Sequence, residues 1–427
     1  MPIGSPGRRR ALRNVVALLV ASLGGRVGNL IVLAMIARGG GAQELGVYAT
    51  ATAVAGYFLV GADLGLGTWV THSGAMDIGR LQEKYSSALG VKGALVGGAT
   101  VALWAIGFIL PYSDETRYLF WLVAIACVLE SFAVLNEAVC RSVERMEFEG
   151  IAGVVRTVVF AVVGIGCILV GLPVWMLGGA FIAGAICRIV VGLFFVGRYV
   201  TFKVDVTAFR ETFRESLPYA ATSVTSLAFT QIDVVVLSLI AAPELVGRYA
   251  AISRLLMVLG SMAILPASAL MPALTKMWAQ TGAKKFAKII GNLLVSAAGA
   301  GLGLAITLLF IGSKVMAFFY GKDFADLGGM LGLASIFLPF RYLNSVLGIG
   351  LTSCGRQAIR ARGMLIGVVA TVGLVLLLVP RYGIGGAVAA LISTEVILVA
   401  SYGYGMKDYL QEIRLPGTQH SYLWRRR

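Results

Sequence analysis

The sequence predicts an all-α polytopic membrane protein with about 12 transmembrane helices in two six-helix pseudo-symmetric lobes. Three observations predict it: the composition, a regular series of apolar runs and an internal repeat. Hydrophobic residues make up 58% of the 427 residues, only 13% are charged, and the mean hydropathy is +0.86. Soluble proteins carry about 25% charged residues, so this chain has too few to cover a soluble surface.

The apolar runs are each long enough for a helix that crosses the hydrocarbon core, which takes about 20 residues. Helices are expected because lipid offers no water to unpaired backbone groups. The first six spans are placed near 14–37, 46–71, 87–110, 118–140, 151–171 and 174–197, and the second six near 216–241, 247–275, 289–311, 329–352, 363–380 and 385–406. The longest polar linker, 198–215, separates an N-terminal lobe, 1–205, from a C-terminal lobe, 206–427, which ends in a short basic cytoplasmic tail.

The distribution of Lys and Arg predicts the topology. Of these residues, 24 fall in the termini and in loops on one side, and 6 fall in loops on the other. Because Lys and Arg accumulate in cytoplasmic loops, both termini are expected in the cytoplasm, with the chain as a multi-pass protein of the inner (cytoplasmic) membrane. The net charge of +15 therefore reflects topology, and no nucleic acid is expected as a partner.

An internal repeat relates the two halves. Ser22-Leu23 matches Ser226-Leu227, and Gly46-Val47-Tyr48-Ala49 matches Gly247-Arg248-Tyr249-Ala250. Later in each half, Pro173 matches Pro380, and the Gly-Gly-Ala run at 178–180 matches that at 385–387. Six spans per half is an even number, so both halves point the same way, and a substrate site is expected between them near the midplane.

Polar residues inside the spans are the candidate site, because a charge there normally faces a partner or a wet cavity. Arg26 shares a helical face with Ser22 and Asn29, and the equivalent face of the second half carries Ser226, Thr230 and Asp233. The expected substrate-binding residues are Arg26, Asn29, Arg341, Asn344, Arg254 and Arg188, and the expected coupling residues are Asp233, Glu130 and Glu395.

Each of these residues also has a structural interpretation. Two facing polar surfaces can form a hydrogen-bond network between the lobes, and Arg26 and Arg341 can form a structural ion pair with Glu130 or Asp233. Near a membrane face, long cationic side chains can extend to water. This applies to Arg156, Arg188, Arg254 and Lys92, while Asp63 also lies near a face.

Several activities lack their motifs. The sequence has no phosphate-binding GxxxxGK[ST] run, no GxSxG, no HExxH and no large loop between spans, so neither an ATP motor nor an enzyme is expected. Five Cys and two His form no metal motif, so no metal site is expected. No cofactor is expected, although a coupling ion, H⁺ or Na⁺, is possible.

A resemblance to a known family rests on short motifs spread over residues 8–410. They are Gly46-Val47-Tyr48-Ala49, Ala62-Asp63-Leu64-Gly65-Leu66-Gly67, Ser216-Leu217-Pro218, and Asp233 followed by Gly247-Arg248-Tyr249-Ala250. Together with the two halves of six spans, they resemble the polysaccharide transporter family of oligosaccharide (O-antigen or capsule repeat-unit) flippases. That family belongs to the multidrug/oligosaccharidyl-lipid/polysaccharide superfamily.

The resemblance implies a flippase that moves undecaprenyl-pyrophosphate-linked oligosaccharide repeat units across the cytoplasmic membrane by alternating access, for cell-surface polysaccharide synthesis. It implies lipid-linked oligosaccharide, membrane lipids and the polysaccharide polymerase machinery as partners. Arg suits pyrophosphate because guanidinium stays charged and binds phosphate through two hydrogen bonds. Two alternatives stay open: a cation-coupled multidrug exporter of the same superfamily, and an integral-membrane enzyme of envelope synthesis.

Overall fold

The computed structural model describes the backbone of residues 5–412, and their side chains except at 5–23, 26, 27, 264–270, 272, 273, 279, 281–284 and 408–412. Within 5–412 every regular element is helical, so the predicted all-α class is confirmed. The α-helices are α1 Ser5–Asp63, α2 Leu66–Met76, α3 Leu81–Ile109, α4 Asp114–Ser142, α5 Met146–Leu169, α6 Leu177–Val196, α7 Phe209–Ile240, α8 Pro243–Ser261, α9 Ile264–Tyr320, α10 Gly328–Ala334, α11 Phe337–Ser353 and α12 Gln357–Glu412.

The helices match a polytopic membrane protein. Among the described residues, eight are long and apolar enough to cross a membrane, or nine when the bent pair α10 and α11 counts as one span. Two of them, Gly28–Met76 and Gln357–Lys407, have 49 and 51 residues, more than twice the ~20 that one crossing needs. Each is kinked at a glycine with positive φ, Gly41 (68°) and Gly383 (56°), and so supplies two crossings. With the more polar α8, this agrees with the predicted total of about twelve.

Three predicted spans are interrupted rather than continuous. The span 46–71 breaks where Leu64 and Gly65 both have positive φ, 39° and 74°, a conformation that ends a right-handed helix. The span 247–275 breaks between α8 and α9, and the span 329–352 breaks between α10 and α11 with a bend of 48°. The predicted spans 14–37 and 46–71 are joined by the kink at Gly41 within α1.

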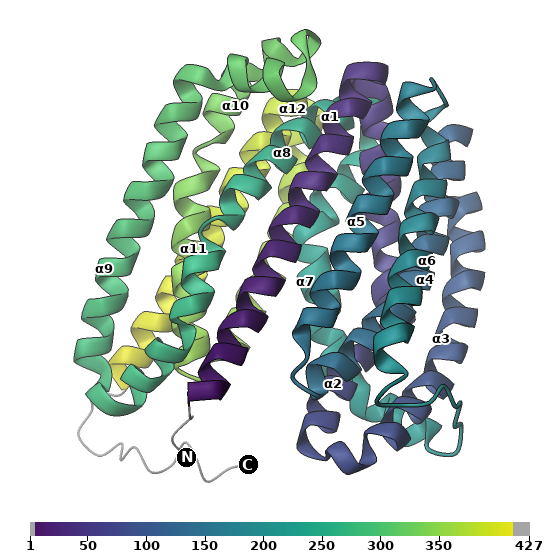
Figure 1. Ribbon diagram of the computed structural model, residues 1–427. Helices are drawn as coiled ribbons and strands as arrows, with labels where there is room; N and C mark the ends of the chain where they lie inside the picture. Colours follow the sequence, from purple (N-terminus) through teal and green to yellow (C-terminus); the bar gives the residue numbers. More distant parts are fainter. Residues whose placement is uncertain (1–4, 413–427) are drawn as a thin grey trace. The chain divides into compact units, whose positions relative to one another are not determined.

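The chain packs as two compact units. Unit 1 comprises Met1–Ala251 and Ala317–Phe324, and unit 2 comprises Ile252–Met316 and Ala325–Arg427. The two units are defined by contacts between residues, whereas the lobes 1–205 and 206–427 are defined by the sequence repeat. The lobes therefore stay a prediction. In unit 1, α4 packs against α1 and α6, and α5 packs against α1 and α6, as Figure 1 shows for α4, α5 and α6.

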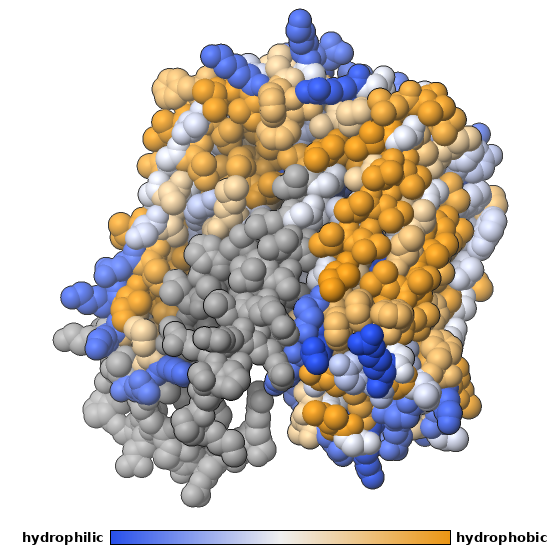
Figure 2. Space-filling view, in the orientation of Figure 1, coloured by the Kyte–Doolittle hydropathy of each residue, from blue (hydrophilic) through white to orange (hydrophobic). Residues whose placement is uncertain are grey.

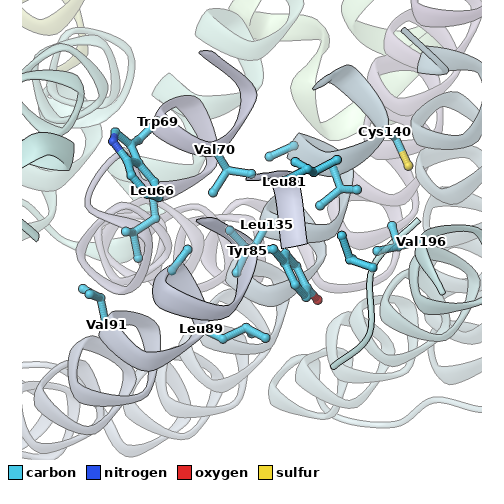
Figure 3. Packing of buried hydrophobic residues seen from close by; sticks show 14 residues of the cluster. Leu66, Trp69, Val70, Leu81, Tyr85, Leu89, Val91, Leu135, Cys140 and Val196 are labelled. Atoms are coloured by element: carbon cyan, nitrogen blue, oxygen red, sulfur yellow. The ribbon is translucent and has the colours of Figure 1, made fainter. Parts of the chain in front are cut away.

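The core of unit 1 contains a cluster contributed by α2, α3, α4 and α6 (Figure 3). Leu66 and Trp69 from α2 pack with Tyr85 from α3 and Leu135 from α4, and all four are buried. The Tyr85 hydroxyl donates to Asn136 Oδ1 at 2.8 Å, which satisfies a polar group inside this apolar cluster.

The outer surface of unit 1 is apolar along its helices. Figure 2 shows hydrophobic side chains over most of the length of these helices and hydrophilic ones towards their ends. Large apolar side chains such as Val101, Phe108, Val158 and Phe194 are more than half exposed. A soluble protein rarely exposes so broad an apolar surface, whereas lipid tails cover it without cost.

The predicted linker 198–215 is shorter in the structure, because α7 begins at Phe209. Its first part is fixed to α3: the Asp205 N–H donates to the Ser86 carbonyl at 3.1 Å. The hydroxyl and backbone N–H of Thr207 donate to Asp205 Oδ1, and these hydrogen bonds hold the pKa of Asp205 below its usual range. The linker is therefore a docked segment.

Two repeat-equivalent glycines form a close helix crossing within unit 1. A Cβ on Gly46 of α1 would overlap the carbonyl oxygen of Pro243, and a Cβ on Gly247 of α8 would overlap that of Ala42. Ala42 and Pro243 occupy equivalent positions in the repeat, as the two glycines do. Each repeat thus presents the same surface to the other, and only glycine allows this approach.

Candidate functional site

The polar face of the first helix is described only in part. The side chain of Arg26, a predicted substrate-binding residue, lies outside the described residues. Asn29 is exposed on α1, and its Oδ1 accepts a hydrogen bond of 3.2 Å from the Tyr48 hydroxyl.

The second repeat contains the same contact. Asp233 on α7 stands where Asn29 stands in the first repeat, and Tyr249 stands where Tyr48 stands. The Tyr249 hydroxyl donates to Asp233 Oδ2 at 2.6 Å, and Asp233 is 8% exposed. The structure therefore supports the internal repeat at the level of individual atoms.

Unit 1 also contains a cluster of alternating charges on α4, α5 and α6. Arg156 of α5 pairs with Glu130 of α4. Arg188 of α6 binds Glu137 through two parallel hydrogen bonds of 2.8 and 2.9 Å and reaches Glu130 at 3.4 Å. The carboxylates of Glu130 and Glu137 are buried, so the guanidinium groups compensate charges that lipid or protein would otherwise leave unpaired.

The cluster continues towards the end of α4. Arg141 reaches Glu137 at 3.6 Å and binds Glu149 of α5 at 2.7 Å. The chain of charges therefore runs Arg156–Glu130–Arg188–Glu137–Arg141–Glu149, and its three positive and three negative groups balance.

Unit 2 contains a smaller polar group between α11 and α12. Arg341 NH1 binds Glu395 Oε1 at 3.0 Å. Asn344, one turn along α11, donates to Glu395 Oε2 at 2.5 Å and to the Glu395 carbonyl oxygen at 3.0 Å. Glu395 is 2% exposed and therefore depends on these donors for its charge.

The structure thus brings together residues that the sequence assigned to different roles. Arg188 and Arg341, expected to bind substrate, pair with Glu130 and Glu395, expected to couple an ion. The structural interpretation of Arg341 named Glu130 or Asp233 as its partner, and the structure shows an ion pair with Glu395. Arg254 is half-buried on α8.

One ion pair lies deeper than the sequence indicated. Lys92 of α3, expected to extend to water, is 0% exposed and binds Asp63 Oδ1 at 2.8 Å and the Ser131 carbonyl at 2.6 Å. Asp63 ends α1, and its other oxygen accepts a hydrogen bond from the Gly67 N–H at 3.3 Å in the first turn of α2. Lys92 therefore fixes the break between α1 and α2. The sequence signal for this ion pair was the presence of a Lys and an Asp in two neighbouring predicted spans.

In the described part of the chain, no group of three or more His, Cys, Asp or Glu side chains is placed to bind a metal ion. The five cysteines are free thiols.

Comparisons with known proteins identify the family. A family profile described as "Polysaccharide biosynthesis protein" matches residues 11–278. The capsular polysaccharide biosynthesis protein CapF of Staphylococcus aureus is 22% identical over 222 residues, which are 51% of this chain and 56% of that protein. The match therefore spans little more than half the length of that relative.

Solved structures share the fold. An inward-facing multidrug resistance MATE family transporter of the MOP superfamily aligns with a TM-score of 0.75 at 17% identity, over 93% of this chain and 99% of that chain. The lipid II flippase MurJ, in an inward closed conformation, aligns with a TM-score of 0.71 at 14% identity, over 93% of this chain and 90% of that one. At such identities the likeness is one of fold.

Proposed function

Because the chain belongs to the polysaccharide biosynthesis protein family, we propose that it moves lipid-linked oligosaccharide repeat units across the cytoplasmic membrane by alternating access. The family and the fold are those of membrane transporters and flippases, so the chain is a MOP-type transporter rather than an enzyme. The observation that carries the proposal is the family match over residues 11–278 on a chain with the fold of a lipid II flippase.

The proposed substrate is an oligosaccharide on undecaprenyl pyrophosphate, for cell-surface polysaccharide synthesis. Its pyrophosphate suits a guanidinium, which supplies two parallel donors and a permanent charge. We assign this role to Arg26, which shares a helical face with the exposed Asn29, and keep Arg254 as a second candidate. The glycan would meet polar residues and the prenyl chain would stay in lipid. Membrane lipids and the polymerase machinery are the further proposed partners.

The proposed energy source is a gradient of H⁺ or Na⁺. Asp233 is the candidate site, because a buried carboxylate gains from binding a proton or a cation. Tyr249 donates a hydrogen bond to the same carboxylate at 2.6 Å.

A second candidate function is a cation-coupled multidrug exporter, which the fold shared with the MATE transporter favours. The interior arginines Arg188 and Arg341 do not count against this alternative, because each forms an ion pair with a buried carboxylate that neutralises its charge.

A deletion strain and proteoliposomes distinguish the two functions. In the strain, loss of surface glycan with lipid-linked repeat units retained on the cytoplasmic side supports the flippase. In proteoliposomes, purified protein should move a fluorescent lipid-linked oligosaccharide between leaflets faster than empty vesicles. Drug sensitivity with normal surface glycan would instead indicate the exporter.

A further inference from the structure

The ends of α4 and α11 establish which residues of these helices are equivalent. Both end with a residue of positive φ, Glu144 (57°) and Gly355 (76°). The same backbone hydrogen bonds surround each: Arg145 N–H donates to the Cys140 carbonyl at 2.8 Å, and Arg356 N–H donates to the Leu351 carbonyl at 2.9 Å. Counted back from these ends along uninterrupted helix, Glu130 of α4 is equivalent to Arg341 of α11.

The helices α6 and α12 are matched by the segments that lead into them. Pro173 matches Pro380, and the Gly-Gly-Ala runs at 178–180 and 385–387 follow at the same distance. Counted forward from these runs, Arg188 of α6 is equivalent to Glu395 of α12. Both helices are regular between the matched run and these residues.

The two equivalences describe one ion pair with its charges exchanged. In unit 1, Glu130 of α4 faces Arg188 of α6 at 3.4 Å. In unit 2, Arg341 of α11 faces Glu395 of α12 at 3.0 Å. Acid and base have changed places between two equivalent pairs of helices, and in both units the carboxylate is buried.

We propose that these two ion pairs are a single repeated element that ties the fourth crossing of each repeat to the sixth, and that its polarity does not matter for transport. Glu130, Arg188, Arg341 and Glu395 are then positioning residues that keep each unit rigid, and neither the substrate anion nor the coupling ion binds them. Four of the nine residues that the sequence indicated are thereby reassigned, and five stay as candidates for the site: Arg26, Asn29, Arg254, Asn344 and Asp233.

The surroundings in unit 2 make the exchange testable. Asn344 donates its amide to Glu395, and rotation of that amide by half a turn would present its oxygen to a cation instead. In unit 1, Glu137 and Arg156 also contact the pair, so a reversal there would disturb more charges. The experiment therefore uses Arg341→Glu, Glu395→Arg and the double variant.

Each single reversal places two like charges together in a buried position, and should lower the melting temperature of the purified protein by about 5 °C or more. The double variant restores an ion pair in the polarity of unit 1, and should melt within about 2 °C of the wild type. Lys314→Glu, a reversal at an exposed residue of α9, controls for the added charge and should leave melting unchanged. A double variant no more stable than the single ones would overturn the proposal, as would stable single variants.

Transport provides the second measurement, and this part rests on the proposed flippase function. The double variant should flip a fluorescent lipid-linked oligosaccharide within about twofold of the wild-type rate. A double variant that folds but does not flip would overturn the proposal, because Arg341 or Glu395 would then act on substrate or ion. A wild type that fails to flip counts against the function alone, since melting still decides the role of the ion pair.

If the single variants express poorly, a second double variant still tests the proposal by comparison with the charge-exchanged one. The variant Arg341→Met, Glu395→Leu replaces the pair by apolar side chains, which buried ion pairs often tolerate. If this apolar variant is stable and the charge-exchanged one is not, polarity matters and the proposal is wrong.

Discussion

Tyr249 donates its hydroxyl to Asp233 at 2.6 Å, at the position where Tyr48 donates to Asn29 in the first repeat. The same donor thus meets a carboxylate in one repeat and an amide in the other. Because the first repeat shows that Asn accepts this hydrogen bond, the effect of the Asp233 charge can be separated from the effect of the contact.

We predict that Asp233→Asn keeps the fold and loses coupling. Its melting temperature should stay within about 2 °C of the wild type, because the amide oxygen can accept from Tyr249 as Asn29 accepts from Tyr48. Flipping driven by an ion gradient should fall about tenfold, because a neutral amide no longer binds a proton or Na⁺. Tyr249→Phe, which removes the donor and keeps the carboxylate, is the control. Unchanged ion dependence in Asp233→Asn would remove this residue from the coupling site.

Arg26 should be required for transport of an anionic lipid. Arg26→Lys keeps the charge but loses the two parallel donors, and we expect about tenfold slower flipping, with Arg26→Ala slower still. Surface-glycan complementation at matched protein level measures this, with Lys314→Ala as the control. Full complementation by Arg26→Ala would show that the anion binds elsewhere.

Lys92→Met should destabilise unit 1 by about 3–5 kcal/mol, because it leaves the Asp63 carboxylate without its buried partner. Adding Asp63→Asn should recover part of this loss, since the charge is removed while the amide oxygen can still accept from the Gly67 N–H. Thermal melting of the two single variants and the double variant measures the coupling. Additive losses would mean that the two residues act separately.

Gly46→Ala should cost on the order of 2 kcal/mol, because its Cβ would overlap the Pro243 carbonyl oxygen, which the backbone of α8 holds in place. Gly61→Ala lies on the same helix with nothing within 4 Å of the added Cβ. That control should be neutral or slightly stabilising, because Ala favours helix over Gly. Equal melting temperatures for the two variants would show that the crossing tolerates a side chain.

Reporter fusions should place both termini in the cytoplasm. The expectation rests on the 24 to 6 distribution of Lys and Arg, and the fusions at Gly4 and Gln419 measure it. A signal from the outer side at either position would contradict twelve spans with both ends inside.

The sequence predicted those features of the fold that follow from its internal repeat and from the spacing of its apolar residues. The helical class, the matched glycines and the equivalence of Asn29 with Asp233 follow from spacing along one chain. Pairing across helices does not, because Glu130 and Arg188 lie on different helices whose rotation depends on packing. Lys92 was misplaced for the same reason: its depth was judged from distance along the span, while Asp63 and the Ser131 carbonyl hold it inside the unit.

The break between α1 and α2 at Leu64 and Gly65 was also not predicted from the sequence. Residues 62–67 contain Asp63 and two glycines, but they lie inside a long apolar segment that was assigned to one span. A non-glycine residue of positive φ such as Leu64 is uncommon enough that the sequence pattern does not predict it. The hydrogen bonds of Asp63 with Lys92 and Gly67 stabilise that conformation, and they exist only in the folded unit.

The crossing of Gly46 and Gly247 has a consequence for how such a chain arises and diverges. Residue 46 meets residue 243 while residue 247 meets residue 42, so the contact is isologous, like the interface of a symmetric dimer. A chain with a single repeat would carry both sides of this surface and could pair with a second copy of itself. After duplication and fusion, a larger residue at position 46 would overlap the backbone at Pro243, and a larger residue at position 247 would overlap the backbone at Ala42. The two copies can therefore drift apart in charge, as Glu130 and Arg341 have, but not at these two glycines.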